Sequence, residues 1–163
     1  MKHTLLFLLL ICASSLQITV AGNRPKLTDD ELMTLVQKQT FRYFWDFAHP
    51  ESGLARERSN DRLEVATIGG SGFGVMAIIV GVERGFITRE QGAERLLKMV
   101  EFLNKADSYH GIWAHWMDGA TGKTIPFSRK DDGADLVESA FMFEGLLAAH
   151  QYFDRDTPTE NRV

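Results

Sequence analysis

The sequence predicts an all-α fold of about four helices, in which amphipathic and fully apolar helices alternate. Two capping boxes, Thr28–Glu31 and Thr88–Gln91, each precede apolar residues at helical spacing. Two other helical segments, about 70–84 and 132–153, have almost no polar face. A helix that is apolar all round is normally buried. Outer amphipathic helices that alternate with inner apolar ones describe an α/α toroid.

The connections between these helices also alternate. The first helix runs from Thr28 to about Phe47, and the third begins at Thr88 after a link of three residues, 85–87. The other two connections, about 49–68 and 107–130, are long. Both lead into the N-termini of the apolar helices, so we expect them to share one end of the bundle. Long loops in a compact unit are usually functional.

Composition and the first residues limit the class of protein. The chain has 163 residues and a net charge of −4, which suits one globular unit and gives no basic surface for nucleic acid. Residues 1–21 have a basic start, an apolar core too short to span a bilayer, and Ala21 at a suitable cleavage site. We expect a signal peptide, no stable membrane span, and export of a domain of residues 22–163 to the periplasm or medium. Lipoprotein processing at Cys12 has weaker support, because Ile11 replaces the usual small residue.

Three carboxylates mark the start of the fourth helix. Asp131, Asp135 and Glu138 are spaced i, i+4 and i+7, which predicts that they stack on one helical face. Ionised carboxylates on a buried apolar helix cost folding free energy unless they are paired, solvated in a cleft or used in chemistry. The alternative is a capped helix start with Asp131 or Asp132 as the N-cap. That alternative accounts poorly for Glu138, and both interpretations stay open.

Aromatic, cationic and imidazole side chains gather in the two long connections. Such groups suit stacking on sugar rings and hydrogen bonding to hydroxyls, whereas the alternative packs the tryptophans as loop anchors. The candidate substrate-binding residues are Arg56, Arg58, Trp113, His115, Trp116 and Arg129, together with Asp131.

Motifs for cofactors and metals fail on inspection. The segment 72–77 matches G-x-G-x-x-A, and 64–68 resembles a preceding strand, but a helix follows where a second strand is needed. The segment 122–124 lacks the first glycine of a P-loop. No H-E-x-x-H pattern or thiolate cluster is present. We therefore expect neither cofactor nor metal.

Several ordered blocks resemble the glucoamylase-like domain family, which includes bacterial endo-β-1,2-glucanases. The blocks are Gln39–Phe47, Gly53–Arg56, Val65–Gly74 and Asp131–Ala140, and the resemblance covers about residues 30–155. It implies an (α/α)6 toroid and inverting hydrolysis of a glucan. It also implies that Asp131, Asp135 and Glu138 line the substrate pocket, with Arg56 and Trp116 as sugar contacts.

The chain departs from this family in length, because it supplies about four of the twelve helices of such a toroid. We expect the N-terminal part of a larger glycosidase, inactive by itself. Inversion needs two carboxylates about 6.5–9.5 Å apart, whereas Asp135 and Glu138 lie about 5–6 Å apart at Cβ. The second carboxylate should therefore come from a helix beyond Val163.

The expected roles follow from that geometry. Asp135 and Glu138 bind sugar hydroxyls or transfer protons, and Asp131 orders the loop or pairs with Arg56, Arg58 or Arg129. Two other classes stay open. One is a non-catalytic glycan-binding protein of a polysaccharide-uptake system. The other is a structural helical bundle.

Overall fold

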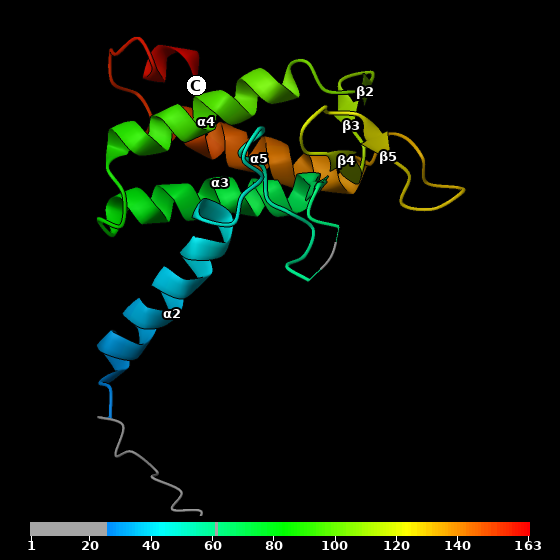
Figure 1. The fold of residues 1–163 in the computed structure, drawn as a ribbon. Helices are drawn as coiled ribbons and strands as arrows, with labels where there is room; N and C mark the ends of the chain where they lie inside the picture. The colour runs from blue at the N-terminus through cyan, green and yellow to red at the C-terminus, as the bar shows by residue number, and fades with distance from the viewer. Residues whose placement is uncertain (1–25, 61) are drawn as a thin grey trace, which may run out of the picture. The chain divides into compact units, whose positions relative to one another are not determined.

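The computed structural model describes residues 26–60 and 62–163 (Figure 1). The predicted signal peptide lies outside these residues. About half of the described residues are helical. The helices in the described part are α2 (Asp29–Trp45), α3 (Ile68–Glu83), α4 (Arg89–Leu103), α5 (Leu136–Tyr152) and a 3-10 turn, η1 (Glu160–Arg162). None of the helices within these two ranges is long and apolar enough to cross a bilayer.

The chain divides into two compact units, residues 1–32 and 33–163. In the first unit, the structure describes residues 26–32 and shows the predicted capping box. The Thr28 N–H donates to the Glu31 carboxylate at 2.8 Å, and the Glu31 N–H donates to the Thr28 hydroxyl at 3.3 Å. The remaining description concerns the second unit.

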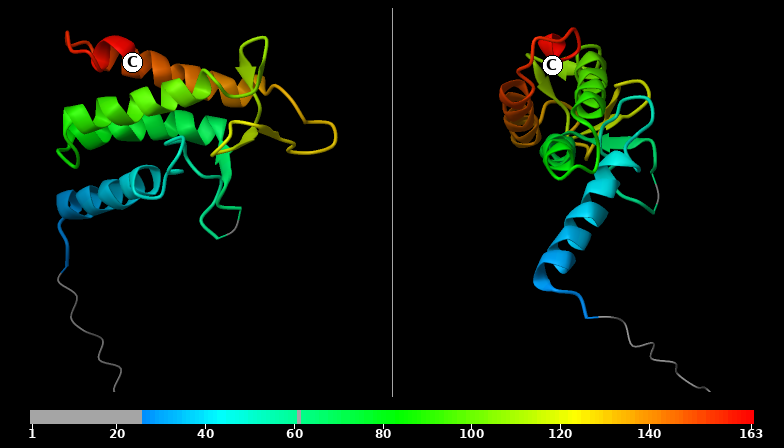
Figure 2. Two further views of the ribbon diagram at one scale, coloured as in Figure 1. Left: turned by 45° about the horizontal axis from the view of Figure 1, so that its top comes forward. Right: turned by 90° about the vertical axis from the view of Figure 1, so that its left-hand side faces the viewer.

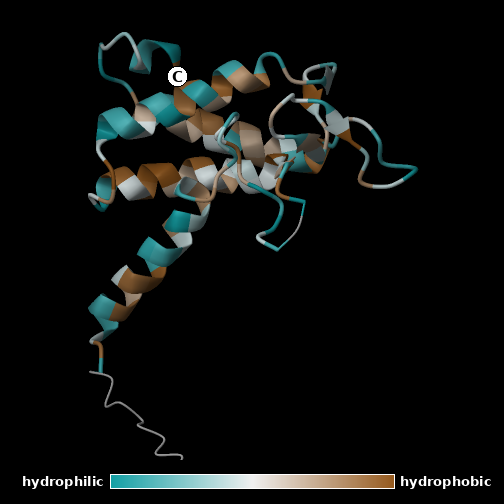
Figure 3. Ribbon diagram, viewed as in Figure 1, coloured by the Kyte–Doolittle hydropathy of each residue, from teal (hydrophilic) through white to brown (hydrophobic). Residues whose placement is uncertain are grey.

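Helix α4 is amphipathic, as predicted, and its Thr88–Gln91 capping box is present. It buries Ala93, Leu96 and Met99 against the core. Helix α3 is apolar on nearly every face, and Figure 3 shows the contrast between these two helices. In Figures 1 and 2, α3, α4 and α5 lie side by side, with α3 and α5 parallel to each other.

Two glycines allow α3 and α5 to cross closely. A Cβ atom on Gly72 would lie 2.2 Å from the Phe141 carbonyl oxygen, and one on Gly145 would lie 2.6 Å from the Gly72 carbonyl oxygen. Real Cβ atoms do not approach main-chain oxygen so closely, so only glycine fits at either position. The prediction that the glycines of 72–77 serve helix packing is confirmed at Gly72.

The prediction of about four helices is confirmed for the described residues, but the two long connections, predicted as loops, contain short strands. Strands β1 (Val65–Thr67), β4 (Trp116–Asp118) and β5 (Thr124–Ile125) form one antiparallel sheet, in which β4 is central. Strands β2 (Ser108–Tyr109) and β3 (Ile112–Trp113) form a hairpin. Strands of two or three residues are too short to show an alternating pattern. They form because segments some fifty residues apart meet, with Ala66 opposite Met117.

The sheet joins the two connections at the N-terminal ends of α3 and α5, as Figure 1 shows. The prediction that both connections share one end of the bundle is therefore confirmed. The strand before segment 72–77 exists as β1, but it pairs antiparallel with β4. A dinucleotide-binding unit needs a parallel second strand, so the structure supports the exclusion of that motif.

Part of the apolar surface of α3 and α5 is exposed rather than buried. A groove of about 530 Å³ is lined by Phe73 and Met76 of α3 and by Phe141 of α5. The Phe73 and Phe141 rings pack against each other there, with their centroids 5.1 Å apart. All three side chains are more than 40% exposed, and so is Leu147 at 66%. Contiguous exposed apolar surface of this kind commonly marks an interaction site.

Candidate active site

Asp135 is the N-cap of α5, so the predicted start of this helix at about Asp132 is wrong. Its Oδ1 accepts hydrogen bonds from the main-chain N–H groups of Val137, at 2.9 Å, and Glu138, at 3.0 Å. Its Oδ2 lies 3.1 Å from His115 Nδ1. Neither Asp131 nor Asp132 caps the helix. Asp135 is therefore held on both oxygens, by the helix end and by one imidazole.

Glu138 lies in the first turn of α5, yet its carboxylate reaches α3. Its Oε2 accepts a hydrogen bond from the Gly69 N–H at 2.8 Å and lies 3.4 Å from the Thr67 hydroxyl. Thr67 is the N-cap of α3 but makes no side-chain capping bond of its own. Glu138 therefore supplies the cap that α3 lacks, from a neighbouring helix.

Gly69 makes this contact possible. A Cβ atom at this position would lie 2.5 Å from Glu138 Oε2, and its three nearest neighbours all belong to the Glu138 carboxylate. The two carboxylates, Asp135 and Glu138, thus both accept hydrogen bonds from helix N-termini. These ends carry the positive pole of the helix dipole, which attracts negative charge.

Asp131 precedes the helix, so the predicted stack of three carboxylates on one helical face is wrong. Its main chain closes a tight turn with Ser128, and its carbonyl oxygen accepts from the Phe127 and Ser128 N–H groups. The turn nevertheless brings Asp131 to the site. Side-chain donor atoms of Asp131, Asp135 and His115 all lie within 4.8 Å of one another.

This group of one imidazole and two carboxylates is close enough to hold a cation. The same set can accept hydrogen bonds from sugar hydroxyls. The expectation that no metal binds stays a prediction.

Trp116 is packed as an anchor in this chain. It is 7% exposed, its Nε1–H donates to Glu57 at 3.0 Å, and its ring contacts both the Phe127 ring and the Arg62 guanidinium. Little of its ring face is left for a sugar. The alternative of a packed loop anchor describes this placement, and the role of Trp116 in substrate binding stays a prediction.

Trp113 is anchored as well. Its Nε1–H donates to the Leu103 carbonyl at 3.4 Å, and its ring packs on Phe143 at 5.1 Å. Its main chain bonds the buried Ser139 hydroxyl, whose oxygen lies 3.0 Å from the Trp113 nitrogen and 3.2 Å from its carbonyl oxygen. Strand β3 is thereby tied to α5, and it ends two residues before His115.

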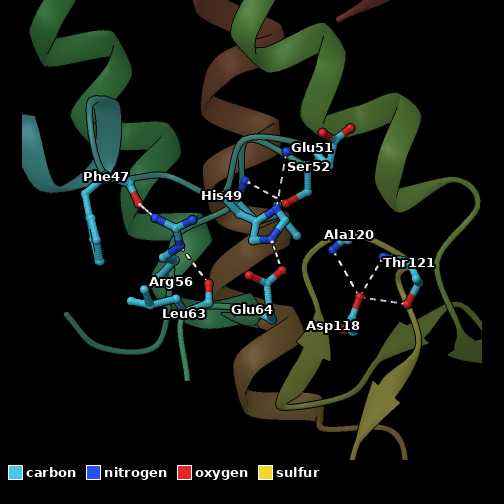
Figure 4. Close-up of polar contacts among 11 residues, drawn as sticks. Phe47, His49, Glu51, Ser52, Arg56, Leu63, Glu64, Asp118, Ala120 and Thr121 are labelled. Carbon is cyan, nitrogen blue, oxygen red and sulfur yellow. Dashed lines mark hydrogen bonds and ion pairs between the residues drawn. The ribbon is translucent and has the colours of Figure 1, made fainter. Parts of the chain in front are cut away.

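Arg56 binds main-chain carbonyls rather than Asp131. Its Nε donates to Leu63 at 2.7 Å and its Nη1 to Phe47 at 3.2 Å (Figure 4). These bonds close the connection between α2 and β1, so the predicted pairing of Arg56 with Asp131 is wrong. Arg58 pairs with Glu57 at 2.9 Å. Arg129 is exposed in the turn beside Asp131.

The buried His49, which sequence reasoning missed, holds the connection between α2 and β1 in place. The ring is 2% exposed, and its Nε2 lies 3.0 Å from the Glu64 carboxylate (Figure 4). Gly119 packs against the same ring. Nearby, a hydrogen bond from the Thr121 hydroxyl holds the pKa of Asp118 below its usual value. No local pattern marks a histidine of this kind, since its contacts come from distant segments.

The geometry agrees with comparisons to known proteins. A Bacteroides uniformis protein proposed to be a glucoamylase is 83% identical, with a TM-score of 0.83 over 84% of this chain and 34% of that one. The endo-β-1,2-glucanase of Chitinophaga pinensis, solved with sophorotriose and glucose, is 52% identical, with a TM-score of 0.80 over 83% and 34%.

The exo-β-1,2-glucooligosaccharide sophorohydrolase (non-reducing end) of Parabacteroides distasonis is 50% identical over 146 residues. That match covers 89% of this chain and 20% of the relative. No family profile matches the chain. The chain is thus homologous to hydrolases of β-1,2-glucans, which confirms the resemblance. It spans about a fifth of the curated relative and about a third of the solved structures.

Proposed function

We propose that this chain forms the first helices of an (α/α)6 toroid that hydrolyses a β-1,2-linked glucan with inversion. The observation that carries this proposal is the pair of carboxylates, Asp135 and Glu138, at the joined N-termini of α3 and α5. Homology to proteins named for hydrolysis of β-1,2-glucans supplies the linkage. The parallel, glycine-crossed pair α3 and α5 would form part of the inner ring.

The carboxylates leave defined atoms for the substrate. Glu138 Oε2 is used by the Gly69 N–H, whereas Oε1 accepts no hydrogen bond from the described residues. That oxygen can accept a sugar hydroxyl or orient the attacking water. Asp135 Oδ2 faces His115, which can share a second hydroxyl with it. Asp131, on the adjoining turn, adds a third acceptor.

An inverting mechanism uses a general acid on one face of the sugar and a base with its water on the other, with carboxyl groups about 6.5–9.5 Å apart. Asp135 and Glu138 supply one face. A carboxyl group from the part of the relatives' length that this chain does not span would supply the other.

A chimera tests this proposal most directly. Residues 26–163 of this chain would replace the matching segment of the Chitinophaga pinensis endo-β-1,2-glucanase, to which they are 52% identical. We expect the chimera to release oligosaccharides from β-1,2-glucan, and Asp135→Asn and Glu138→Gln to abolish most of that release. Glu94→Gln, an exposed carboxylate on α4, is the matched control. A folded chimera that hydrolyses no β-1,2-glucan would refute the proposal.

The same chimera separates the two alternative classes. Glucan binding without hydrolysis would indicate a glycan-binding protein. A structural bundle predicts that apolar residues of similar size at Asp135 and Glu138 keep stability and cost no binding.

We also propose that the protein is exported and that its mature form begins at Gly22. Intact-mass measurement on the exported material tests this. A mass that includes residues 1–21, or a lipid on Cys12, would contradict it.

A further inference from the structure

An exposed aromatic ring lies beside the carboxylate site and is carried by the tight hairpin of β2 and β3. Tyr109 is 67% exposed and ends strand β2, paired with Ile112 of β3. The two residues between them, His110 and Gly111, both have positive φ, at 52° and 81°. Positive φ at both central positions is typical of the tight type I′ hairpin. The hairpin therefore fixes the backbone that carries the exposed Tyr109 ring, which lies edge-on to the His110 ring at 4.2 Å.

A pocket of about 450 Å³ opens next to this ring. It is lined by Tyr109 and by the segment 130–134, which includes Asp131. The far wall is also fixed, because Ala134 pairs with Ala114 and the Asp135 N–H donates to the Trp113 carbonyl at 2.8 Å. One wall of the pocket is thus apolar and aromatic, and the other is polar.

We infer that this pocket is a glucosyl-binding subsite, in which the Tyr109 ring stacks on a pyranose face and Asp131 accepts hydroxyl hydrogen bonds. A pyranose ring has an apolar C–H face and a rim of hydroxyl donors, which matches these two walls. The pocket is adjacent to the catalytic candidates, because Asp131 lies within 4.8 Å of both Asp135 and His115.

The charges select the class of sugar. The lining contains two carboxylates, Asp131 and Asp132, and one ammonium group, Lys130. This balance disfavours sugar acids and sugar phosphates and suits a neutral glucose unit. A fixed aromatic ring loses little conformational freedom on binding, which favours affinity. The inference rests on the proposed function and extends it to a named subsite.

Titration of the full chain with sophorotriose, followed by NMR, tests the subsite. We expect shifts at Gly133 and Ala134, and Tyr109→Ala should weaken binding by about tenfold or more. Tyr109→Phe should weaken it by no more than about threefold, since the ring rather than the hydroxyl stacks. Leu147→Ala is the matched control, because Leu147 is 66% exposed but does not line this pocket. Its affinity should equal that of the wild type.

Wild-type affinity in Tyr109→Ala, or shifts confined to other segments, would overturn the subsite. So would a loss of folding stability in Tyr109→Ala, seen by circular dichroism, with no change in affinity.

If the chain alone does not bind sophorotriose, the same variants are compared in the chimera through KM. An active chimera whose KM is unchanged by Tyr109→Ala overturns the subsite and leaves the proposed function standing. An inactive chimera together with no binding overturns both.

Discussion

The contact between Glu138 and Gly69 leads to an unusual prediction for a helix, because alanine should be worse than glycine there. Alanine in a helix is normally about 0.8–1.0 kcal/mol more favourable than glycine. At Gly69, however, the added methyl would lie 2.5 Å from Glu138 Oε2 and must displace the carboxylate. The helix would then lose its cap from α5.

The magnitude follows from the contacts that are lost. A hydrogen bond to a charged group contributes about 1.5–3 kcal/mol, and the Gly69 N–H bond at 2.8 Å is of this kind. The Thr67 hydroxyl at 3.4 Å adds little, because it is at the limit of hydrogen-bond length. Partial exposure of Glu138 favours the lower part of the range. We expect Glu138→Ala to cost about 1–2 kcal/mol and Glu138→Gln, which keeps an acceptor oxygen, to cost less.

A double-mutant cycle isolates the contact. Gly69→Ala should destabilise the wild type by about 1 kcal/mol but should be neutral or stabilising in the Glu138→Ala background, because the three closest neighbours of the new methyl belong to Glu138. Chemical denaturation of the four proteins, followed by circular dichroism, gives the coupling energy. Stabilisation of the wild type by Gly69→Ala would refute the argument that Glu138 caps α3.

Three further predictions concern catalysis, assembly and pH. In the chimera, Asp135→Asn or Glu138→Gln should lower kcat at least about 100-fold if either group transfers a proton, and should mainly raise KM if both only hold hydroxyls. Asp132→Asn should have a far smaller effect, and wild-type kinetics in both the Asp135 and Glu138 variants would refute the assignment of this site. The 163-residue chain alone should hydrolyse no glucan and should self-associate through the exposed α3–α5 groove; size measurement showing a stable monomer would contradict this. The Arg89 guanidinium lowers the pKa of Glu160 below its ordinary value of 4.5. The ion pair therefore stabilises the fold above about pH 4.5, and this stabilisation is lost as the pH falls through the lowered pKa. Glu160→Gln should weaken the fall in unfolding free energy at acid pH, and an unchanged fall would show that the pair does not contribute.

The helices were predictable because their signals are local. Thr88 and Gln91 lie within one turn, and their capping box appears as expected. The start of α5 was misplaced because three aspartates in a short stretch, 131–135, can each serve as the N-cap, and only the turn that Asp131 makes with Ser128 decides between them. The sequence thus named Asp131 and Asp135, which the structure brings within 4.8 Å of each other, but it gave the wrong geometry for their meeting.

The strands and the supporting contacts were not predictable, since they depend on distant pairings. Ala66 meets Met117 across fifty residues, and Glu138 bonds Gly69 across sixty-nine. Arg56 is a residue type that commonly binds sugars, yet its donors bond the Leu63 and Phe47 carbonyls within the connection between α2 and β1. Spacing along one helix carries no information about such partners.

The glycine crossing of α3 and α5 makes the site sensitive to residues that carry no chemistry. Gly145 lies ten residues after Asp135, about 15 Å along the helix axis. A methyl group there would push the helices apart, because it would meet the Gly72 carbonyl oxygen at 2.6 Å. Because α3 and α5 are rigid and packed against each other at this crossing, a displacement there would also move their N-terminal ends, which carry the candidate carboxylates, away from each other. In the chimera, a conservative replacement of Gly145 by alanine would therefore be expected to lower turnover, although the candidate carboxylates themselves are unchanged.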